Sequence, residues 1–134
     1  RCDVAGVYDG CDFHDGADFG VGGVSGVSAY PIYKGIVSSV LTEEQSLSTS
    51  FNMCGNSVFV WHEDLGITSI YCHLEKSSVS VGDNVLPDNQ IGLIGTSGGS
   101  TGIHLHLGIY KGSDPYTAEA INPEQWLSDN SVIW

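Results

Sequence analysis

The chain has 134 residues, a formal net charge of −12 and only four basic residues. That charge argues against polyanionic partners, so neither nucleic acid nor an anionic membrane surface is an expected partner. No apolar run approaches the ~20 residues that span a bilayer, so membrane insertion is not expected. Eighteen Gly, with many Val, Ile, Ser and Thr, favour short strands joined by tight turns.

The expected elements follow from alternation and turn residues along the chain. Residues 1–13 predict an irregular lead-in, and residues 13–23 run into a Gly-rich turn. Alternating or β-rich stretches predict strands at residues 32–41, 57–62, 68–74, 79–85, 90–95 and 103–110.

Turns, loops and one helix complete this expectation. Turn residues at 63–66 and 86–89 predict two hairpins. The polar stretch 42–56 predicts a long surface loop that forms one wall of a substrate groove. Asn122 before Pro123 is typical of an N-cap and first helical residue, and begins a short helix through Trp126.

Two short pieces of sequence carry possible metal ligands, His14-x-x-x-Asp18 and His104-Leu105-His106. Residues two apart in a strand share a face, so His104 and His106 are aimed into the same space. A Gly-containing turn can bring His14 and Asp18 onto one metal. The two pieces supply three good zinc ligands and one spare imidazole. Two His and one carboxylate, with a position open for water, are typical of a catalytic zinc site.

The chain has five histidines, and the remaining two are interpreted differently. His73 is either a half-buried strand histidine bonded to the backbone or a catalytic imidazole beside the metal. His62, at the end of a predicted strand, is expected to be a surface residue near the hairpin turn without a catalytic role.

Four cysteines can pair in three ways, and none shows the C-x-x-C spacing of a zinc site. We favour the pairs nearest in sequence, Cys2–Cys11 and Cys54–Cys72. Cys72 then points away from the cleft if His73 points into it. Two disulfides imply an oxidising compartment and a secreted or periplasmic protein, the alternative being four buried free thiols in the cytosol.

The chain resembles the lysostaphin/LytM-type zinc endopeptidases, a group that includes staphylolytic and β-lytic proteases. The matching segments, in order over about residues 12–127, are FHDGADFG, YPIYKGIV, NSVFVWHEDLG, YCHLEKSSVSVGDNVLPDNQIGLIGTSGGSTGIHLHLGIY and INPEQWL. The resemblance implies one zinc metalloendopeptidase catalytic domain over residues 1–134. We expect it to be mainly β, with antiparallel sheets forming a groove, long surface loops and one short C-terminal helix. The start at Arg1 rather than Met predicts a processed or excised domain.

The resemblance also implies the roles of the site residues, with one Zn²⁺ per chain. Its ligands would be His14, Asp18 and His106. The resemblance makes His73 and His104 the metal-free catalytic histidines. Of these we assign His104 as the general base and His73 as the proton shuttle or oxyanion stabiliser, and the two roles could be exchanged. Tyr8 lies at the spacing where some members place a tyrosine that steadies the transition state.

The implied function is that of an exported monomer that hydrolyses peptide bonds in peptidoglycan cross-links through a zinc-activated water. A narrow groove would exclude bulky side chains and select bonds next to small residues. One alternative is the same chemistry on Gly-rich proteins such as elastin. A second, of another class, is a non-catalytic, zinc-retaining binding or signalling domain.

Overall fold

The structure is a computed structural model that describes residues 2–3, 17–20, 22, 26–98 and 102–129, with only the backbone described for residues 2–3 and 17–19. Its strands are β1 (Cys2–Asp3), β2 (Ala17–Gly20), β3 (Ser28–Ala29), β4 (Gly35–Leu41), β5 (Asn56–His62), β6 (Ile67–Ser77), β7 (Asn84–Val85), β8 (Gly92–Ile94), β9 (His104–Lys111) and β10 (Ala120–Ile121). Its helices are α1 (Glu43–Ser46) and α2 (Pro123–Asp129).

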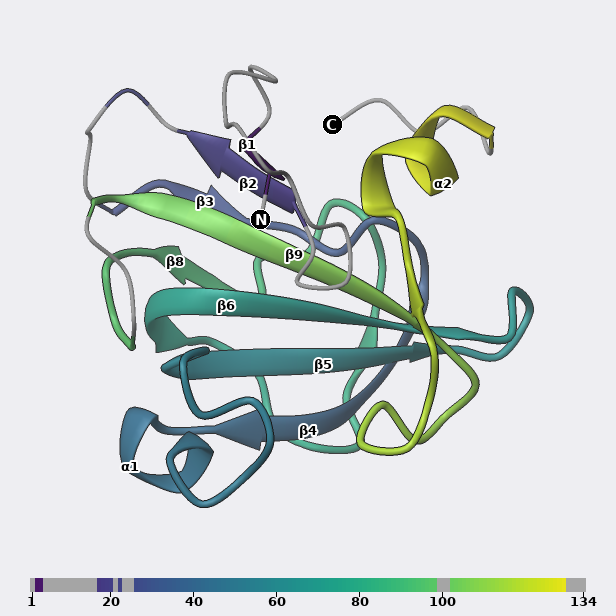
Figure 1. Ribbon diagram of the computed structural model, residues 1–134, viewed down its shortest axis with the longest axis horizontal. Coiled ribbons are helices and arrows are strands. Elements are labelled where there is room, and N and C mark those ends of the chain that lie inside the picture. Colours follow the sequence, from purple (N-terminus) through teal and green to yellow (C-terminus); the bar gives the residue numbers. More distant parts are fainter. Residues whose placement is uncertain (1, 4–16, 21, 23–25, 99–101, 130–134) are drawn as a thin grey trace.

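One curled sheet organises these elements, and its long strands β9, β6, β5 and β4 lie side by side in that order (Figure 1). Their pairings are antiparallel, and β2 continues the sheet antiparallel to the other edge of β9. The shorter β8 pairs with both β6 and β3. The prediction of a mainly β domain of antiparallel strands with one short C-terminal helix is confirmed.

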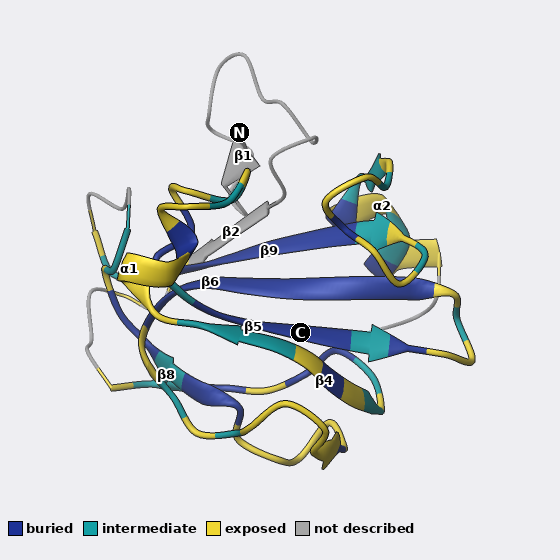
Figure 2. Cartoon of the chain, turned by 90° about the horizontal axis from the view of Figure 1, so that it is seen from below, coloured by how far each residue is buried: buried dark blue, intermediate teal, exposed yellow. Residues whose placement is uncertain are grey.

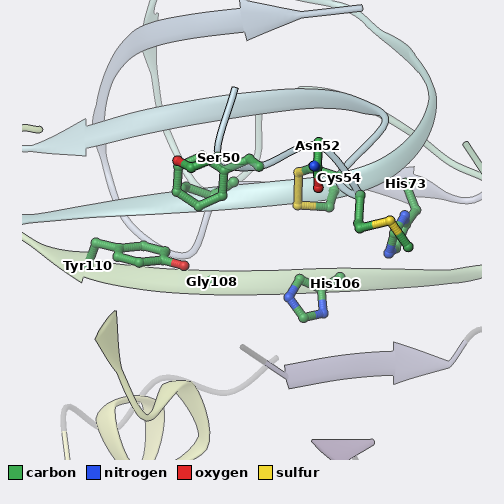
Figure 3. Close-up of a pocket in the computed structure, with 11 residues that line it drawn as sticks. Ser50, Asn52, Cys54, His73, His106, Gly108 and Tyr110 are labelled. Atoms are coloured by element: carbon green, nitrogen blue, oxygen red, sulfur yellow. A yellow bond between two sulfur atoms is a disulfide. The ribbon is translucent and has the colours of Figure 1, made fainter. Parts of the chain in front are cut away.

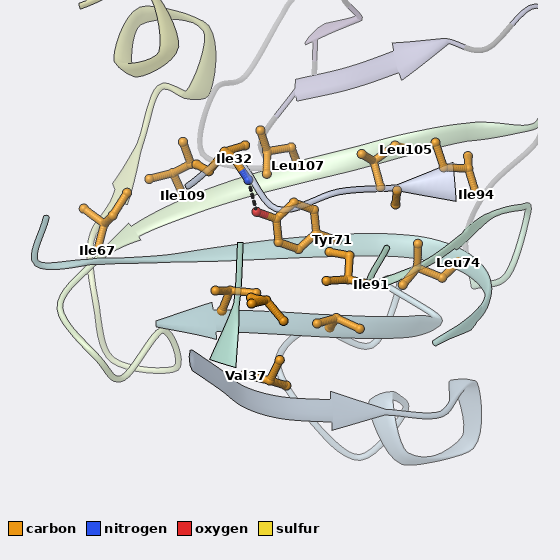
Figure 4. Close-up of a cluster of buried hydrophobic side chains, with 14 of the residues drawn as sticks. Ile32, Val37, Ile67, Tyr71, Leu74, Ile91, Ile94, Leu105, Leu107 and Ile109 are labelled. Carbon is orange, nitrogen blue, oxygen red and sulfur yellow. Dashed lines mark hydrogen bonds between the residues drawn. The ribbon is translucent and has the colours of Figure 1, made fainter. Parts of the chain in front are cut away.

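The main hydrophobic core lies on the concave side of this sheet, where alternate residues of the long strands meet β3, β7 and β8 (Figure 4). Its largest fully buried members include Tyr71, Leu74, Leu105 and Leu107. A second, smaller cluster on the opposite face consists of Cys54, Phe59, Ile70 and Cys72. Because both faces are covered, β6 is buried along most of its length (Figure 2).

A series of buried hydrogen bonds crosses the main core, and His62 takes part in it. The His62 Nδ1 donates to the Lys34 carbonyl (2.8 Å), because a carbonyl can only accept. The His62 Nε2 therefore accepts from the Ser69 hydroxyl (2.7 Å), which in turn contacts the Tyr71 hydroxyl (2.7 Å). The Ile32 amide donates to the Tyr71 oxygen (2.9 Å).

The expectation of a surface position for His62 is therefore wrong, since the residue is fully buried. Alternation along β5 places it on the same face as Val58 and Val60, and Ser69 of β6 supplies the partner that makes burial possible. Burial lowers the pKa of His62, against an opposing contribution from its bond to the Lys34 carbonyl.

The loop expected over residues 42–56 contains a helical turn, α1. The Thr42 side chain accepts from the Gln45 amide and the Gln45 side chain accepts from the Thr42 amide, which together form a capping box. Thr42 and Gln45 are three residues apart, so the capping box could have been recognised in the sequence.

The hairpin expected between residues 79–85 and 90–95 does not form. Residues 86–89 do make a turn, closed by the bond from the Asn89 amide to the Leu86 carbonyl (2.9 Å). However, β7 before it pairs with β4, whereas β8 after it pairs with β3 and β6. The turn therefore connects two strands that have different partners, and it does not close a two-stranded hairpin.

The C-terminal helix begins where the sequence indicates. The Asn122 Oδ1 accepts from the amides of Glu124 (3.1 Å) and Gln125 (3.3 Å), which satisfies donors that the helix cannot pair itself. In the described part of the chain, neither helix has the length and apolar character that a bilayer crossing requires.

Candidate active site

Strand β9 presents two different faces, as the alternation of residues 103–110 predicts. Leu105, Leu107 and Ile109 point into the main core. The intervening residues His106, Gly108 and Tyr110 line a pocket of about 440 Å³ on the other face (Figure 3). His104 belongs to the same set by its spacing.

Strand β6 departs from strict alternation at His73. Val58 of β5 pairs with Tyr71 and Asn56 pairs with Leu74, so Cys72 and His73 together oppose the single residue between them on β5. This is a β-bulge, and His73 has φ +65°, the only positive φ of a non-Gly residue in the described chain.

The bulge brings Cys72 and His73 onto the same pocket. The expectation that Cys72 points away when His73 points in is therefore wrong, because it assumed a regular strand. Holding a histidine in the left-handed region costs free energy, and residues with strained backbones of this kind are concentrated at functional sites.

Three hydrogen bonds hold His73 in this conformation. Its amide donates to the Cys54 carbonyl (2.7 Å), and its own carbonyl accepts from the Gly95 amide (3.0 Å). Its ring Nδ1 lies 2.7 Å from the Ser97 carbonyl. Since that carbonyl can only accept, Nδ1 carries a hydrogen, and Nε2 is the nitrogen through which the neutral ring takes up a proton.

The Ser97 carbonyl is itself held by a tight contact between two loops. The Ser97 hydroxyl donates to the Leu74 carbonyl (2.6 Å) and accepts from the Asn56 amide (3.0 Å). Beside it, Gly55 and Gly98 pack backbone to backbone, both with positive φ. A Cβ at Gly98 would lie 2.5 Å from the Gly55 nitrogen. This contact requires glycine, and it determines where the acceptor for His73 lies.

His104 is oriented in the same manner as His73. Its Nδ1 lies 2.9 Å from the Gly102 carbonyl, so this nitrogen also carries a hydrogen. The His104 ring centroid is 4.8 Å from that of His73, and the His106 ring centroid is 5.9 Å from that of His73. The structure thus brings His73, His104 and His106 together, from two strands far apart in sequence.

The other expected site residues are described in part or not at all. In the pairing of β2 with β9, Asp18 lies directly opposite His106. His14, Tyr8 and Cys11 lie outside the described residues. No group of three or more His, Cys, Asp or Glu within those residues could hold a metal ion, so the three clustered histidines do not form a metal site by themselves.

A disulfide joins Cys54 to Cys72, which is one of the two expected pairs. Both sulfur-bearing residues line the pocket, next to His73. The bond ties the loop before β5 to the bulged part of β6. It therefore fixes Cys54, whose carbonyl accepts the hydrogen bond from the His73 amide.

Several pocket residues were not identified from the sequence. The loop residues 50–53 form one wall, as the groove expectation for 42–56 anticipates in outline. Ile70, Gly108 and Tyr110 complete the pocket. Gly108 and Tyr110 could have been found, because they continue the alternating series that starts with His104 and His106.

Comparison with known proteins gives concordant matches. The model of peptidase family M23 matches residues 12–123. An uncharacterized metalloprotease of Buchnera aphidicola subsp. Baizongia pistaciae is 36% identical over 121 residues, covering 90% of this chain and 28% of the relative. The peptidoglycan DD-endopeptidase ShyC of Vibrio cholerae is 38% identical over 81 residues, covering 57% of this chain and 18% of that relative. This chain therefore spans less than a third of either relative.

The solved structures that are similar in fold and sequence include the following two. The catalytic domain of lysostaphin from Staphylococcus simulans superposes with a TM-score of 0.72 at 29% identity, covering 86% of this chain and 79% of that domain. A zinc-containing peptidase from Vibrio cholerae superposes with a TM-score of 0.60 at 26% identity, covering 82% of this chain and 28% of that one.

Proposed function

This chain belongs to peptidase family M23, and we propose that it is an exported zinc metalloendopeptidase that hydrolyses peptide bonds in peptidoglycan cross-links. The observation that carries the proposal is the meeting of the His73, His104 and His106 rings, of which His73 and His106 line one pocket. A relative named as a peptidoglycan DD-endopeptidase supports the substrate class. The disulfide Cys54–Cys72 supports an oxidising, and hence secreted or periplasmic, location.

The set of His14, Asp18 and His106 fits a zinc ion by the chemistry of its donor atoms. Asp18 and His106 occupy directly opposed positions on β2 and β9, and His14 lies four residues before Asp18 in the sequence. Two imidazoles and a carboxylate are one of the ligand sets that catalytic zinc sites use. We assign His14, Asp18 and His106 as the ligands. When bound, zinc would supply Lewis acidity and lower the pKa of a coordinated water towards about 7.

His104 and His73 then have the proton-transfer roles. Each ring is held through Nδ1 by a backbone carbonyl, which leaves Nε2 as the atom that exchanges protons. His104 accepts the proton of the attacking water. His73 donates to the oxyanion or to the leaving amine, and its ring lies near enough to that of His104 for the two to act in one reaction. Imidazole suits both roles because its ordinary pKa lies near neutral pH.

Tyr8 is the remaining assignment, and it rests on its place six residues before His14. We propose that its hydroxyl steadies the developing oxyanion. The chain acts as a monomer, with the peptide of the cell wall as its partner.

The proposal is tested by incubating the protein with peptidoglycans that carry pentaglycine or direct cross-links, and with elastin, with and without a chelator. Mass analysis of the new termini identifies the bond. We expect chelator-sensitive cleavage of peptidoglycan. Purified protein that takes up no zinc, or cleavage that a chelator leaves untouched, would contradict the assignment.

Variants separate an enzyme from a binding domain. His104→Ala and His73→Ala should each reduce the rate roughly 10²- to 10⁴-fold while zinc remains bound. His62→Gln is the matched histidine control, since His62 lies in the core away from the pocket. If His104→Ala kept full biological activity, the non-catalytic alternative would be favoured instead.

A further inference from the structure

The pocket beside the histidines has a second, apolar half. At one end lie His73 and His106, and further along β9 lie Gly108 and Tyr110 (Figure 3). Phe51 and Ile70 line the pocket with them. The two halves belong to one continuous cavity, so a peptide whose cleaved bond lies at the histidines has a neighbouring residue within reach of the apolar half.

The room in this apolar half depends on Gly108. A Cβ at this position would lie 3.1 Å from the Tyr110 Cε1 and 3.9 Å from the Ile70 Cβ. The Tyr110 ring therefore lies close over the bare backbone of Gly108. A methyl group there would require the ring to shift by a few tenths of an ångström and would occupy space that is otherwise part of the pocket.

The walls of the apolar half are held in place before any ligand binds. The Phe51 ring makes edge contacts with Phe59 and Tyr110, each at 5.5 Å between centroids, and with Tyr116 at 5.3 Å. Phe59 is 1% exposed and belongs to the second core cluster. Edge-to-face aromatic groups of this kind are favourable and restrict movement of the rings.

The chemistry of the lining selects against charge. Among the described residues that line the pocket there is no Asp, Glu, Lys or Arg. A carboxylate or ammonium group placed between Phe51, Ile70 and Tyr110 would lose its hydration without gaining an ionic partner. An uncharged apolar side chain would instead gain from each methylene that it buries.

We propose that Phe51, Ile70, Gly108 and Tyr110 form a subsite for an uncharged apolar side chain on the substrate residue that flanks the cleaved bond. This inference rests on the proposed peptidase function and refines its substrate class. It predicts that a residue with a side chain, alanine or larger, is preferred to glycine. Alanine-containing cross-links are then better substrates than purely glycyl ones, in contrast to the narrow groove expected from the sequence.

The test uses peptides of the form Gly-Gly-X-Gly-Gly, with X as Gly, Ala, Leu or Asp, in separate L and D series. For hydrolysis next to X, we expect kcat/KM to rise from Gly through Ala to Leu in at least one series. The ratio of Leu to Gly should be roughly 10-fold or more, and Asp should fall below Gly. A preference for Gly in both series, or equal rates for Leu and Asp, would overturn the subsite.

Two variants and one control test whether the preference for Leu over Gly arises from the proposed subsite. Gly108→Ala should lower the Leu-to-Gly ratio several-fold by displacing the Tyr110 ring. Ser50→Asp places a carboxylate at an exposed position on the same pocket, where folding is not at risk, and should also lower the ratio. Gly66→Ala lies in a distant turn with open space around it and should keep the wild-type ratio. Unchanged ratios in both pocket variants would overturn the assignment.

Binding distinguishes failure of the subsite from failure of the peptidase proposal. Dissociation constants of the same peptides are measured by calorimetry on the metal-free protein. Tighter binding of the Leu peptide, together with no hydrolysis of any peptide by the zinc-loaded protein, would support the subsite and contradict the peptidase function. Hydrolysis with a preference for Gly would support the peptidase function and contradict the subsite.

Discussion

Removal of the disulfide Cys54–Cys72 is expected to destabilise the domain by about 3 kcal/mol. The two cysteines are 18 residues apart, and the chain-entropy relation for a loop of that length gives about 3 kcal/mol at 25 °C. In a domain of this size, that loss lowers the melting temperature by about 10 °C. Because both residues are buried in the cluster with Phe59 and Ile70, the substitution Cys54→Ala/Cys72→Ala adds no unpaired polar group.

The same substitution should also reduce activity, beyond its effect on stability. The Cys54 carbonyl accepts the hydrogen bond from the His73 amide, and the disulfide lies on the wall of the pocket. A loop that is free to move would present that carbonyl for only part of the time. We expect a lower kcat/KM for peptide hydrolysis at a temperature where the double variant is fully folded.

Urea unfolding at neutral pH, followed by circular dichroism, measures the free energy of unfolding of both proteins. The wild type and the double variant are each compared with and without reductant. Reductant should lower the free energy of unfolding of the wild type towards that of the double variant. Any effect of reductant on the variant arises elsewhere in the chain, because the variant lacks the Cys54–Cys72 bond. A free energy of unfolding within about 0.5 kcal/mol of the wild type would refute the loop-entropy argument.

Two further predictions concern His62 and Gly98. Burial lowers the pKa of His62 below 6.5 in the folded chain. On acidification, His62 is therefore protonated in the unfolded chain at a higher pH than in the folded chain. Stability from this residue is complete above pH 6.5 and is lost as pH falls towards the folded pKa, by up to about 1.4 kcal/mol per pH unit. His62→Gln should therefore show a shallower fall in urea midpoint between pH 7 and 5. An unchanged slope would contradict this. Gly98→Ala should lower both stability and kcat, because its Cβ would overlap Gly55 and displace the Ser97 carbonyl from His73. Gly66→Ala has a similar positive φ without the overlap, so it should lose only about 1–2 kcal/mol of stability and no activity. Equal losses of activity in the two variants would show that the loop contact does not position His73.

Regular strands were predictable because alternation is a local property. The stretch 103–110 predicted that His104 and His106 share a face, and the structure places Leu105 and Leu107 on the other. The cap at Asn122 was equally local, since its partners lie two and three residues ahead. Such features need no knowledge of distant residues.

Features that depend on a neighbouring strand could not be predicted in this way. His62 carries a polar ring at the end of a strand, and only its partners Ser69 and the Lys34 carbonyl make its burial favourable. The turn at residues 86–89 looks like a hairpin turn, but other strands compete for the two segments that it joins.

The sequence alone determined the strand-rich architecture, the shared face of the β9 histidines and the set of histidines and carboxylates from which zinc ligands and proton-transfer groups are proposed. Tertiary structure decided which of these groups meet, because β9 pairs with β6 on one side and β2 on the other. It also decided the direction of the His73 ring. A bulge opposite β5 and a carbonyl from the Ser97 loop set that direction, and both come from segments that meet only in the folded chain.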